Sequence, residues 1–451
     1  MKNTLNLIKE IAEKVHSKGG TVYYVGGYVR DKLLGKVNKD IDVEIHNIKP
    51  SKFEKILSEF GEVTKVGVSF GVYNLKGYDI DFSFPRIERK IGAKHTDFEV
   101  TINPYMDLKQ AAQRRDFTIN ALMENALTGE IIDFWGCKND LLAKTIRHID
   151  DDTFIEDPLR VLRAAQFSAR FGFEIAIETL QLCSAIDLTQ LSRERIFIET
   201  KKALIKSDKP SIFFKQLRYM NQLDYWFPEL KVLIGARQNE QYHQEGDVWN
   251  HTMLVLDEAA KLRDKAKQPL YFMLAALCHD FGKPTAFSVD ENGISHTFTH
   301  ETAGLPIVKA FLEKLTTEKN LIKYVLNMTE LHMQPNIKAD NNSRIKSTNK
   351  MFDLSVEPHD LILLAECDSK GKIPIGKVNT DFLCDRLNIF HKMMEAPYLT
   401  GEDLIAAGFA PCEVFTDILA YAHKLRLSGV SKDHALSQTI WYAKKKGCKR
   451  K

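Results

Sequence analysis

Residues 25–31 read VGGYVRD, and this stretch decides the fold of the first part of the chain. The preceding residues 21–25 (TVYYV) are β-branched and aromatic, which predicts a strand. Gly26 and Gly27 then permit a tight turn, after which a helix begins. The free amides at a helix N-terminus and its positive dipole end attract an anion such as a triphosphate. Arg30 is the nearest side chain that can bind this anion through two hydrogen bonds.

Asp40 and Asp42 follow this turn in the sequence Asp-Ile-Asp. In a strand they would lie on one face, with Ile41 facing the core. Carboxylate oxygens are preferred ligands of Mg²⁺, and a two-metal site activates an attacking hydroxyl while it clamps the phosphate under attack. A Gly-Gly pair alone is usually only a turn, and an Asp-x-Asp alone is usually a solvated strand end or cap. In this order, the two patterns favour nucleotide chemistry.

The composition is that of a globular protein. At 451 residues and 44% hydrophobic content, the chain should hold about three domains of roughly 150 residues each. The formal net charge of +3 does not prove a nucleic-acid partner, and the basic residues 444–451 (KKKGCKRK) fit either a solvated tail or a contact with phosphates. Seven cysteines without CxxC spacing predict reduced thiols. No feature of the sequence specifies an oligomeric state.

The first residues predict no export signal. Apolar residues recur at helical spacing among charges in residues 1–17, which predicts an amphipathic helix rather than a signal peptide. No stretch reaches the roughly 18 apolar residues that a membrane span needs. We therefore expect a cytoplasmic protein without a membrane partner.

The sequence predicts an α+β fold, with a head that holds a small mixed β-sheet and an all-α remainder. Short strand-like runs lie among helices at residues 63–68, 80–84 and 129–134, and strand signals nearly vanish beyond residue 150. The expected divisions are a head over residues 1–149, a helical neck over 150–232, a histidine-rich helical domain over 233–395 and a helical tail over 396–451.

Three further motifs follow the first two in order: residues 114–122 (RRDFTINAL), 156–163 (EDPLRVLR) and 192–196 (SRERI). With them, the chain resembles the class II tRNA nucleotidyltransferases, the CCA-adding enzymes related to bacterial poly(A) polymerase. The resemblance runs along most of the chain. Two positions depart from the family pattern, because Cys137 stands where a glycine is usual and Gln113 stands where a basic residue is common. Neither departure touches the expected chemistry.

The resemblance implies a metal site and a nucleotide site in the head. Asp40 and Asp42 would hold Mg²⁺, and a third catalytic carboxylate is expected on a neighbouring strand. Asp81 is best placed for it, Asp79 competes, and Asp81 as a plain surface residue is the alternative. The expected nucleotide-binding residues are Gly26, Gly27, Arg30, Arg115, Asp116, Asn120, Asp157, Arg160 and Arg163.

Arg115, Asp116 and Asn120 would lie near the ribose and phosphates of the incoming nucleotide, as the family pattern places them. Arg115 and Asn120 are natural donors for this task. The alternative is that Asp116 caps a helix by accepting amide bonds, and both roles can hold at once.

Asp157 and Arg160 suggest how a base is selected without a template. The two are three positions apart at the start of a helix and are therefore neighbours. A carboxylate accepts from the amino group of cytosine or adenine, and a guanidinium donates to the adjacent ring nitrogen. Uracil and guanine present the reverse edge, and each buried group left unpaired costs about 1–3 kcal/mol. The alternative is a capped helix with an ordinary Asp–Arg pair.

Residues 86–94 (RIERKIGAK) resemble the flexible loop that, in the family, helps the pocket change from C to A addition. A basic surface loop is the plain alternative. This loop favours a complete CCA-adding enzyme over one that adds only CC.

A second motif set lies downstream and resembles the HD phosphohydrolase superfamily. Its histidines and aspartates follow in the order H…HD…H…H…D, namely His251, His279, Asp280, His300, His332 and Asp368. Imidazole and carboxylate ligands suit one or two transition-metal ions, such as Ni²⁺ or Mn²⁺, that activate water against a phosphoester. His243 and His296 are expected outside the ligand set. Certain bacterial CCA-adding enzymes carry such a domain, whereas their poly(A) polymerase relatives do not.

The sequence therefore favours an enzyme that adds or repairs the 3′-terminal CCA of tRNA from CTP and ATP, with a phosphohydrolase module behind it. A poly(A) polymerase, or an enzyme that adds only CC or only A, is the nearest alternative. An HD nucleotide phosphohydrolase with a regulatory head is a second alternative, and paired metal carboxylates argue against it. A non-catalytic RNA-binding protein fits least, because stacked aromatic and basic signatures are missing.

Overall fold

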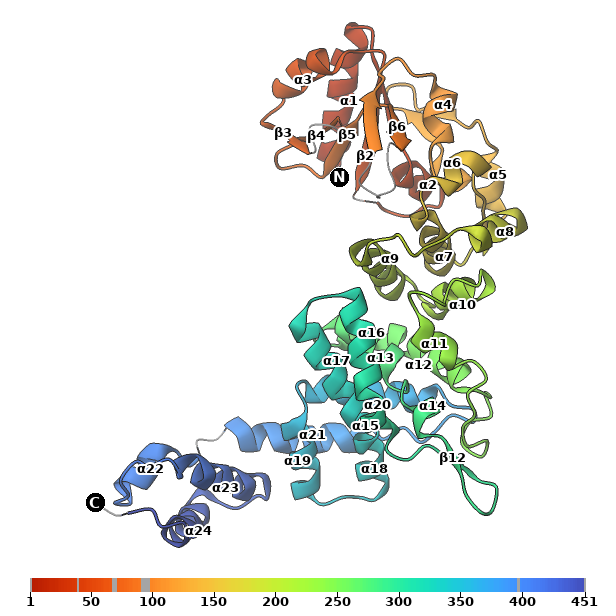
Figure 1. Cartoon of the computed structure of the whole chain (residues 1–451). Coiled ribbons are helices and arrows are strands. Elements are labelled where there is room, and N and C mark those ends of the chain that lie inside the picture. The colour runs from red at the N-terminus through yellow and green to blue at the C-terminus, as the bar shows by residue number, and fades with distance from the viewer. Residues whose placement is uncertain (1, 39, 67–70, 91–97, 396–397, 450–451) are drawn as a thin grey trace. The chain divides into compact units, whose positions relative to one another are not determined.

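The computed structural model describes residues 2–38, 40–66, 71–90, 98–395 and 398–449. The chain forms two compact units, drawn from red to blue along the sequence in Figure 1. The first comprises Met1–Ala203 with Ile212–Trp226, and the second comprises Leu204–Ser211 with Phe227–Lys451. The four finer divisions expected from the sequence stay a prediction.

A mixed seven-stranded sheet forms the centre of the head, in the strand order β3-β4-β5-β2-β1-β8-β9. Strands β2 and β5 run parallel, and the other pairs in this sheet are antiparallel. The α+β prediction is thus confirmed. The strands are β1 (Thr21–Val25), β2 (Ile41–His46), β3 (Val63–Val66), β4 (Val72–Leu75), β5 (Ile80–Ser83), β8 (Met123–Asn125) and β9 (Ile131–Ile132).

Apolar residues on one side of this sheet pack against helices. Helix α1 (Lys2–Ser17) contacts β1 and α3 (Pro50–Ser58) through buried residues that include Ile8 and Ile11. From α3, the buried Phe53 ring packs edge-on against Tyr73 and Phe84. The polar ends of the central strands are therefore free to form a site on a rigid support.

Residues 86–94 were expected to form a flexible loop, and the structure corrects this for the first five. Arg86–Lys90 forms strand β6, which pairs antiparallel with β7 (Phe98–Ile102). The sequence FEVTI of β7 is rich in β-formers and offers β6 a ladder of backbone hydrogen bonds. Residues 91–94 lie outside the described residues.

Helices follow the sheet in the first unit. Helix α7 (Leu159–Phe171) packs into the core through one face, on which Leu159, Leu162, Ala165 and Ala169 are all buried. The other helices of this unit include α2 (Gly27–Leu33), α4 (Leu108–Gln113), α5 (Cys137–Leu142), α6 (Asp151–Ile155), α8 (Ile177–Ala185), α9 (Arg193–Lys206) and α10 (Ser211–Tyr219).

The second unit is built around α13 (Pro269–Cys278), whose sequence PLYFMLAALC is apolar almost throughout. Such a helix must be covered on all sides. It contacts α12 (Val248–Leu262), α17 (Lys319–Leu331) and α20 (Pro358–Lys370). Further elements are α11 (Pro228–Val232), α14 (Lys283–Ala286), α15 (His300–Ala303), α16 (Leu305–Leu315), α18 (Gln334–Asp340), α19 (Ile345–Leu354) and α21 (Thr380–Glu395).

A small helical group ends the described chain, with α22 (Gly401–Ala406), α23 (Phe415–Leu427) and α24 (Lys432–Lys445). Its core contains Leu404, Phe409 and Ile418. In the described part of the chain, no helix combines the length and apolar character that crossing a bilayer requires.

Two candidate functional sites

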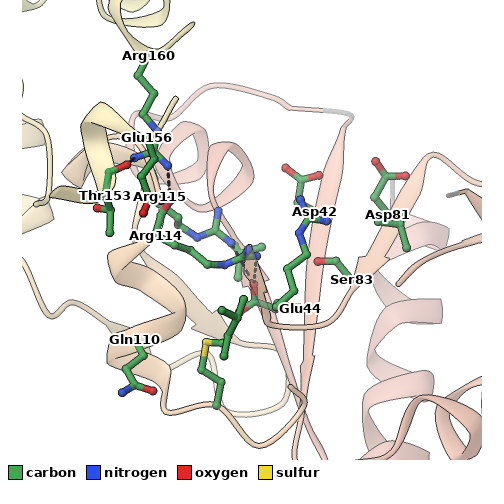
Figure 2. A pocket seen from close by; sticks show the side chains of 15 residues that line it. Asp42, Glu44, Asp81, Ser83, Gln110, Arg114, Arg115, Thr153, Glu156 and Arg160 are labelled. Atoms are coloured by element: carbon green, nitrogen blue, oxygen red, sulfur yellow. Dashed lines mark hydrogen bonds and ion pairs between the residues drawn. The ribbon is translucent and has the colours of Figure 1, made fainter. Parts of the chain in front are cut away.

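A cavity of about 700 Å³ lies at the polar ends of β2 and β5 in the head. Carboxylates line its sheet side, and arginines line the opposite side, as Figure 2 shows. The lining includes Asp42, Glu44, Asp81, Ser83, Arg86, Gln110, Arg114, Arg115, Thr153, Glu156 and Arg160.

Asp42 and Asp81 lie opposite each other on the parallel strands β2 and β5. Both side chains point to the same side of the sheet in Figure 2. Asp40 lies one residue before β2 and is exposed. Asp79, the competing candidate, lies outside β5, and Asp81 is the one of the two that lines the cavity. The three carboxylates Asp40, Asp42 and Asp81 offer hard oxygen donors of the kind that Mg²⁺ prefers.

The electrostatics of Asp42 also fit a cation. Its desolvation by surrounding protein atoms raises its pKa, Arg115 lowers it, and the nearby Asp81 and Asp40 raise it again, so the pKa lies above its ordinary value. Repulsion among carboxylates at one site is relieved by a bound divalent cation.

Glu44 is a site residue that the sequence reading missed. It lies two positions beyond Asp42 on β2, is only 1% exposed, and accepts a hydrogen bond of 2.8 Å from His46 Nε2. Its other oxygen lies 3.6 Å from Arg115 Nη2 and 3.9 Å from Arg114 Nη2. The alternation Asp-x-Asp-x-Glu was the available signal. Strand β2 thus carries both Asp42, a candidate metal ligand, and an anchor for the arginines.

Gly26 and Arg30 support this arrangement from the turn after β1. Gly26 has a φ of 65°, and a Cβ there would lie 2.9 Å from Arg115 Nη1. A larger residue at position 26 would therefore strain the turn and displace this guanidinium. Arg30 is 3% exposed and bonds to Asp31 and Asn120, with its guanidinium 4.5 Å from the Phe171 ring centroid. Its direct contact with phosphates stays a prediction.

Asp116 joins two of the sequence motifs in one network. Its Oδ1 accepts hydrogen bonds of 2.9 Å from the Phe117 amide and from Asn120 Nδ2. Its Oδ2 accepts a bond of 2.7 Å from Arg163 Nε. Burial alone would raise the pKa of Asp116, but Arg163 and Asn120 more than offset this, so the pKa lies below its ordinary value. The alternative of a helix cap is not what the structure forms, because the short helix that it describes at Thr118–Asn120 has Phe117 as its N-cap residue and no side-chain capping bond.

Asp157 and Arg160 are neighbours, as expected, since the Arg160 amide donates to the Asp157 carbonyl at 3.0 Å, but their side chains have separate partners. Asp157 accepts from the Leu159 amide at 3.1 Å and from Arg195 Nη2 at 2.9 Å. Arg160 donates to the carbonyl oxygens of Thr153 and Arg114, each at 2.7 Å. Thus Arg195, from the SRERI motif, is a second residue that the sequence reading missed. The structure does not form the alternative either, because the Asp157 and Arg160 side chains, both in the described part of the chain, make no ion pair with each other.

The second unit brings the residues of the H…HD…H…H…D pattern into one buried cluster. His251 comes from α12, His279 and Asp280 follow α13, His300 begins α15, His332 follows α17, and Asp368 lies in α20. The shortest approaches between them are 3.1 Å for His251–Asp368, His279–Asp280, His300–Asp280 and His300–His332, with each histidine contributing Nε2.

The histidine rings are oriented for metal ligation. His279, His300 and His332 each turn Nδ1 toward a backbone carbonyl three residues earlier, at 2.8, 2.8 and 2.6 Å. A bond at Nδ1 fixes the ring so that Nε2 can bind a metal. Burial would raise the pKa of Asp280, but His279 and Lys283 hold it well below its ordinary value. The donor set therefore fits transition-metal ions.

Asp280 is shared by two groups with metal-ligand spacing, one with His251 and His279 and one with His300 and His332. Such sharing is compatible with two adjacent ion positions. His243, expected outside the ligand set, bonds through Nδ1 to Glu245 at 2.7 Å. Glu245 also lies 3.1 Å from His251 Nδ1, and these two histidines form a further candidate group with it.

Three family models match the chain. Residues 22–147 match the poly A polymerase head domain, residues 172–234 match a model described as "Probable RNA and SrmB-binding site of polymerase A", and residues 248–369 match the HD domain. A carboxylate-bearing sheet, a helical neck and a histidine–aspartate cluster therefore define a nucleotidyltransferase that carries an HD domain. This confirms the resemblance seen in the sequence motifs.

Comparison with curated proteins identifies the family within this class. The multifunctional CCA protein of Actinobacillus pleuropneumoniae is 35% identical over 365 residues, which cover 78% of this chain and 86% of that protein. That of Pseudoalteromonas atlantica is 33% identical over 410 residues, which cover 87% and 95%. The chain belongs to the multifunctional CCA protein family.

Solved structures share the fold. A Thermotoga maritima CCA-adding enzyme complexed with tRNA has a TM-score of 0.64 at 18% identity, covering 97% of this chain and 95% of that chain. A CCA-adding enzyme complexed with ATP has a TM-score of 0.68 at 19% identity, covering 98% and 94%.

Proposed function

We propose that the head adds or repairs the 3′-terminal CCA of tRNA from CTP and ATP, and that the HD cluster is a metal-dependent phosphohydrolase. The observation that supports this proposal most strongly is the position of Asp42 and Asp81, which lie opposite each other on β2 and β5. They border a cavity that Arg114, Arg115 and Arg160 also line. The names of the curated relatives support this function over a poly(A) polymerase or an enzyme that adds only CC or only A.

In the head, the 3′ hydroxyl of tRNA attacks the α-phosphate of the nucleotide, and pyrophosphate leaves. Asp40, Asp42 and Asp81 would hold Mg²⁺, which activates the hydroxyl and neutralises developing charge. Arg115, held by Glu44, binds the negative triphosphate on the opposite side of the cavity. Gly26 gives the backbone and this guanidinium room to approach.

Base choice lies with Asp157 and Arg160. Asp157 is fixed by Arg195, and Arg160 is fixed by two carbonyls, so both side chains are positioned before the base arrives. A fixed carboxylate and guanidinium admit cytosine and adenine and leave uracil and guanine with unpaired groups. Arg163 acts indirectly, because it donates a hydrogen bond to Asp116 and so holds that side chain in position.

In the second unit, His251, His279, Asp280, His300, His332 and Asp368 would hold Ni²⁺ or Mn²⁺, which activate water against a phosphoester. We propose 2′,3′-cyclic phosphate or 2′-phosphate ends as substrates, of the kind found at damaged RNA termini. The setting is the cytoplasm, which fits the seven cysteines, all free thiols.

The test is incubation with tRNA truncated at its 3′ end, first with each labelled nucleotide alone and then with CTP and ATP together. We expect incorporation of C, then A, and no incorporation of U or G. Long A tracts from ATP alone would contradict CCA addition and favour a poly(A) polymerase.

A further inference from the structure

A cavity of about 310 Å³ opens beside the HD cluster, and its lining is chemically divided. His300 and Lys283 lie on its cluster side, whereas Phe298 and Tyr242 contribute aromatic rings. Phe298 is 70% exposed and Tyr242 is 60% exposed. These rings therefore line the cavity with most of their surface open to solvent, where a planar ligand can reach them.

Phe298 follows a hairpin that holds it in place. The hairpin pairs β12 (Ser288–Val289) with β13 (Ser295–His296), and the teal segment labelled β12 projects from the helices of its unit in Figure 1. Asp290 fixes its turn by accepting bonds of 2.9 Å from the Ile294 amide and from His296 Nε2. His296 in turn stacks on Phe298, with ring centroids 4.7 Å apart and planes at 13°. One face of Phe298 is thus supported while the side chain stays open to solvent.

The part of the lining that includes His300 is polar and carries charges of both signs, from Lys283 and Glu301. Lys283 is buried, lies 2.7 Å from Asp280 Oδ2 and donates a bond of 3.0 Å to Gln238 Oε1. Lys283 therefore links the cavity lining to Asp280, and His300 belongs to both the lining and the cluster. A cavity lined by an aromatic ring that also reaches the cluster can hold a base and place the attached phosphoester at the cluster.

We propose that this cavity binds the terminal nucleoside of the HD substrate, with the base stacked on Phe298 and the phosphoester at the cluster. This rests on the phosphohydrolase function proposed above. Stacking tolerates any base, because every base has a π face. The site therefore requires a base without selecting its identity, which suits an enzyme that acts on many RNA ends.

Binding can be measured apart from turnover. Calorimetry on the full chain would compare 2′-AMP with inorganic phosphate, with EDTA in place of Mn²⁺ so that the ester is not hydrolysed during the titration, and with saturating CTP to fill the head. We expect 2′-AMP to bind about ten-fold more tightly than phosphate, and F298A to lose about ten-fold for 2′-AMP alone, the loss of one stacking contact. F298W should keep the affinity, and V289A, an exposed change in the same hairpin, should alter nothing.

Steady-state kinetics would distinguish the base subsite from the hydrolytic activity of the cluster. The wild-type protein should hydrolyse 2′-AMP with a lower KM than glycerol 2-phosphate, which has no base, and F298A should raise only the KM for 2′-AMP. Equal binding of 2′-AMP and phosphate, or unchanged 2′-AMP affinity in F298A, would overturn the base subsite even if hydrolysis is found. If neither ester is hydrolysed, the phosphohydrolase function fails, and the calorimetry still decides the subsite.

Discussion

The head site and the HD cluster arrange their candidate metal ligands in opposite ways. In the head, Asp42 and Asp81 stand at the edge of an open cavity, and the counter-charges are arginines on the far side. In the second unit, four histidines and two aspartates already lie within hydrogen-bond distance of one another in a buried cluster. The head therefore needs nucleotide and metal to complete its site, whereas the HD cluster is assembled by folding.

This difference has an energetic consequence. Changes to the exposed head carboxylates should affect turnover and leave stability alone, because no core cavity opens. Changes to the buried cluster should affect metal content and stability together, because burying a charge without partners is costly. Each site can therefore be tested without disturbing the other.

The largest effect is expected from D42N and D81N. Each removes a carboxylate that would hold Mg²⁺, and metal stabilisation of the reacting phosphate is worth several kcal/mol, so we expect a loss of about 10³-fold in CMP incorporation. The melting temperature should stay within about 2 °C of wild type, since both side chains line a cavity and not the core.

D79N is the matched control, because Asp79 is exposed just before β5. It should retain near-normal incorporation. If D79N fails and D81N works, the third carboxylate is assigned to the wrong residue. Survival of phosphoester hydrolysis in D42N would show that the two sites act independently.

The cluster should respond to D280N with a loss of bound metal, because Asp280 is shared by both ligand groups. Elemental analysis should find less transition metal than in wild type, and hydrolysis should be lost while CCA addition persists. A chelator should lower the melting temperature of wild type and change that of D280N little. A metal at 100 times its dissociation constant stabilises a fold by about 2.7 kcal/mol. Equal metal content in both proteins would refute the cluster assignment.

The sequence predicted that candidate site residues would come together better than it predicted their contacts. Strand alternation predicted Asp40 and Asp42 on one face of a strand, whereas the structure places Asp42 in β2 and Asp40 one residue before it. Helical context pointed to His279 and Asp280, which lie in the buried cluster. The pairing of Asp42 with Asp81 needed the strand order, which only the family resemblance supplied. The six residues of the HD pattern were likewise found by order, and the structure brings them together.

The spacing of residues along the sequence did not predict the contacts that long side chains form. The three-residue spacing of Asp157 and Arg160 predicted a pair, yet Arg160 reaches the carbonyl of Arg114, 46 positions away. Arg195 reaches Asp157 across 38 positions, and Glu44 meets Arg115 across an even longer separation. Such partners depend on packing between elements, for which a single sequence carries no local signal.

R195A should weaken base choice in the head more than it weakens triphosphate binding. Without Arg195, Asp157 keeps one amide bond but loses its side-chain partner, so its carboxylate is less well fixed toward the base. We expect the preference for CTP over UTP to fall about ten-fold, the value of one hydrogen bond of roughly 1.4 kcal/mol. R193A is the matched control, since Arg193 pairs with its exposed neighbour Glu194. Equal discrimination in R195A and R193A would remove Arg195 from base selection.

The smallest effect is expected from E44Q, which tests whether the arginine side of the head is held by a charge. The amide keeps the shape and a hydrogen bond, so the KM for CTP should rise only about three- to ten-fold with kcat little changed.

The effect of E44Q on the free energy of unfolding should depend on pH. Burial would raise the pKa of Glu44, but His46, Arg115 and Arg114 hold it below its ordinary value of 4.5. A carboxyl whose folded pKa is depressed stabilises the fold fully above its unfolded pKa and loses this contribution as pH falls through the folded pKa. The stability difference between wild type and E44Q, measured by denaturant unfolding, should therefore be constant above about pH 5 and shrink in acid. A difference that instead grew in acid would show that Glu44 is protonated in the folded head and does not anchor the arginines by its charge.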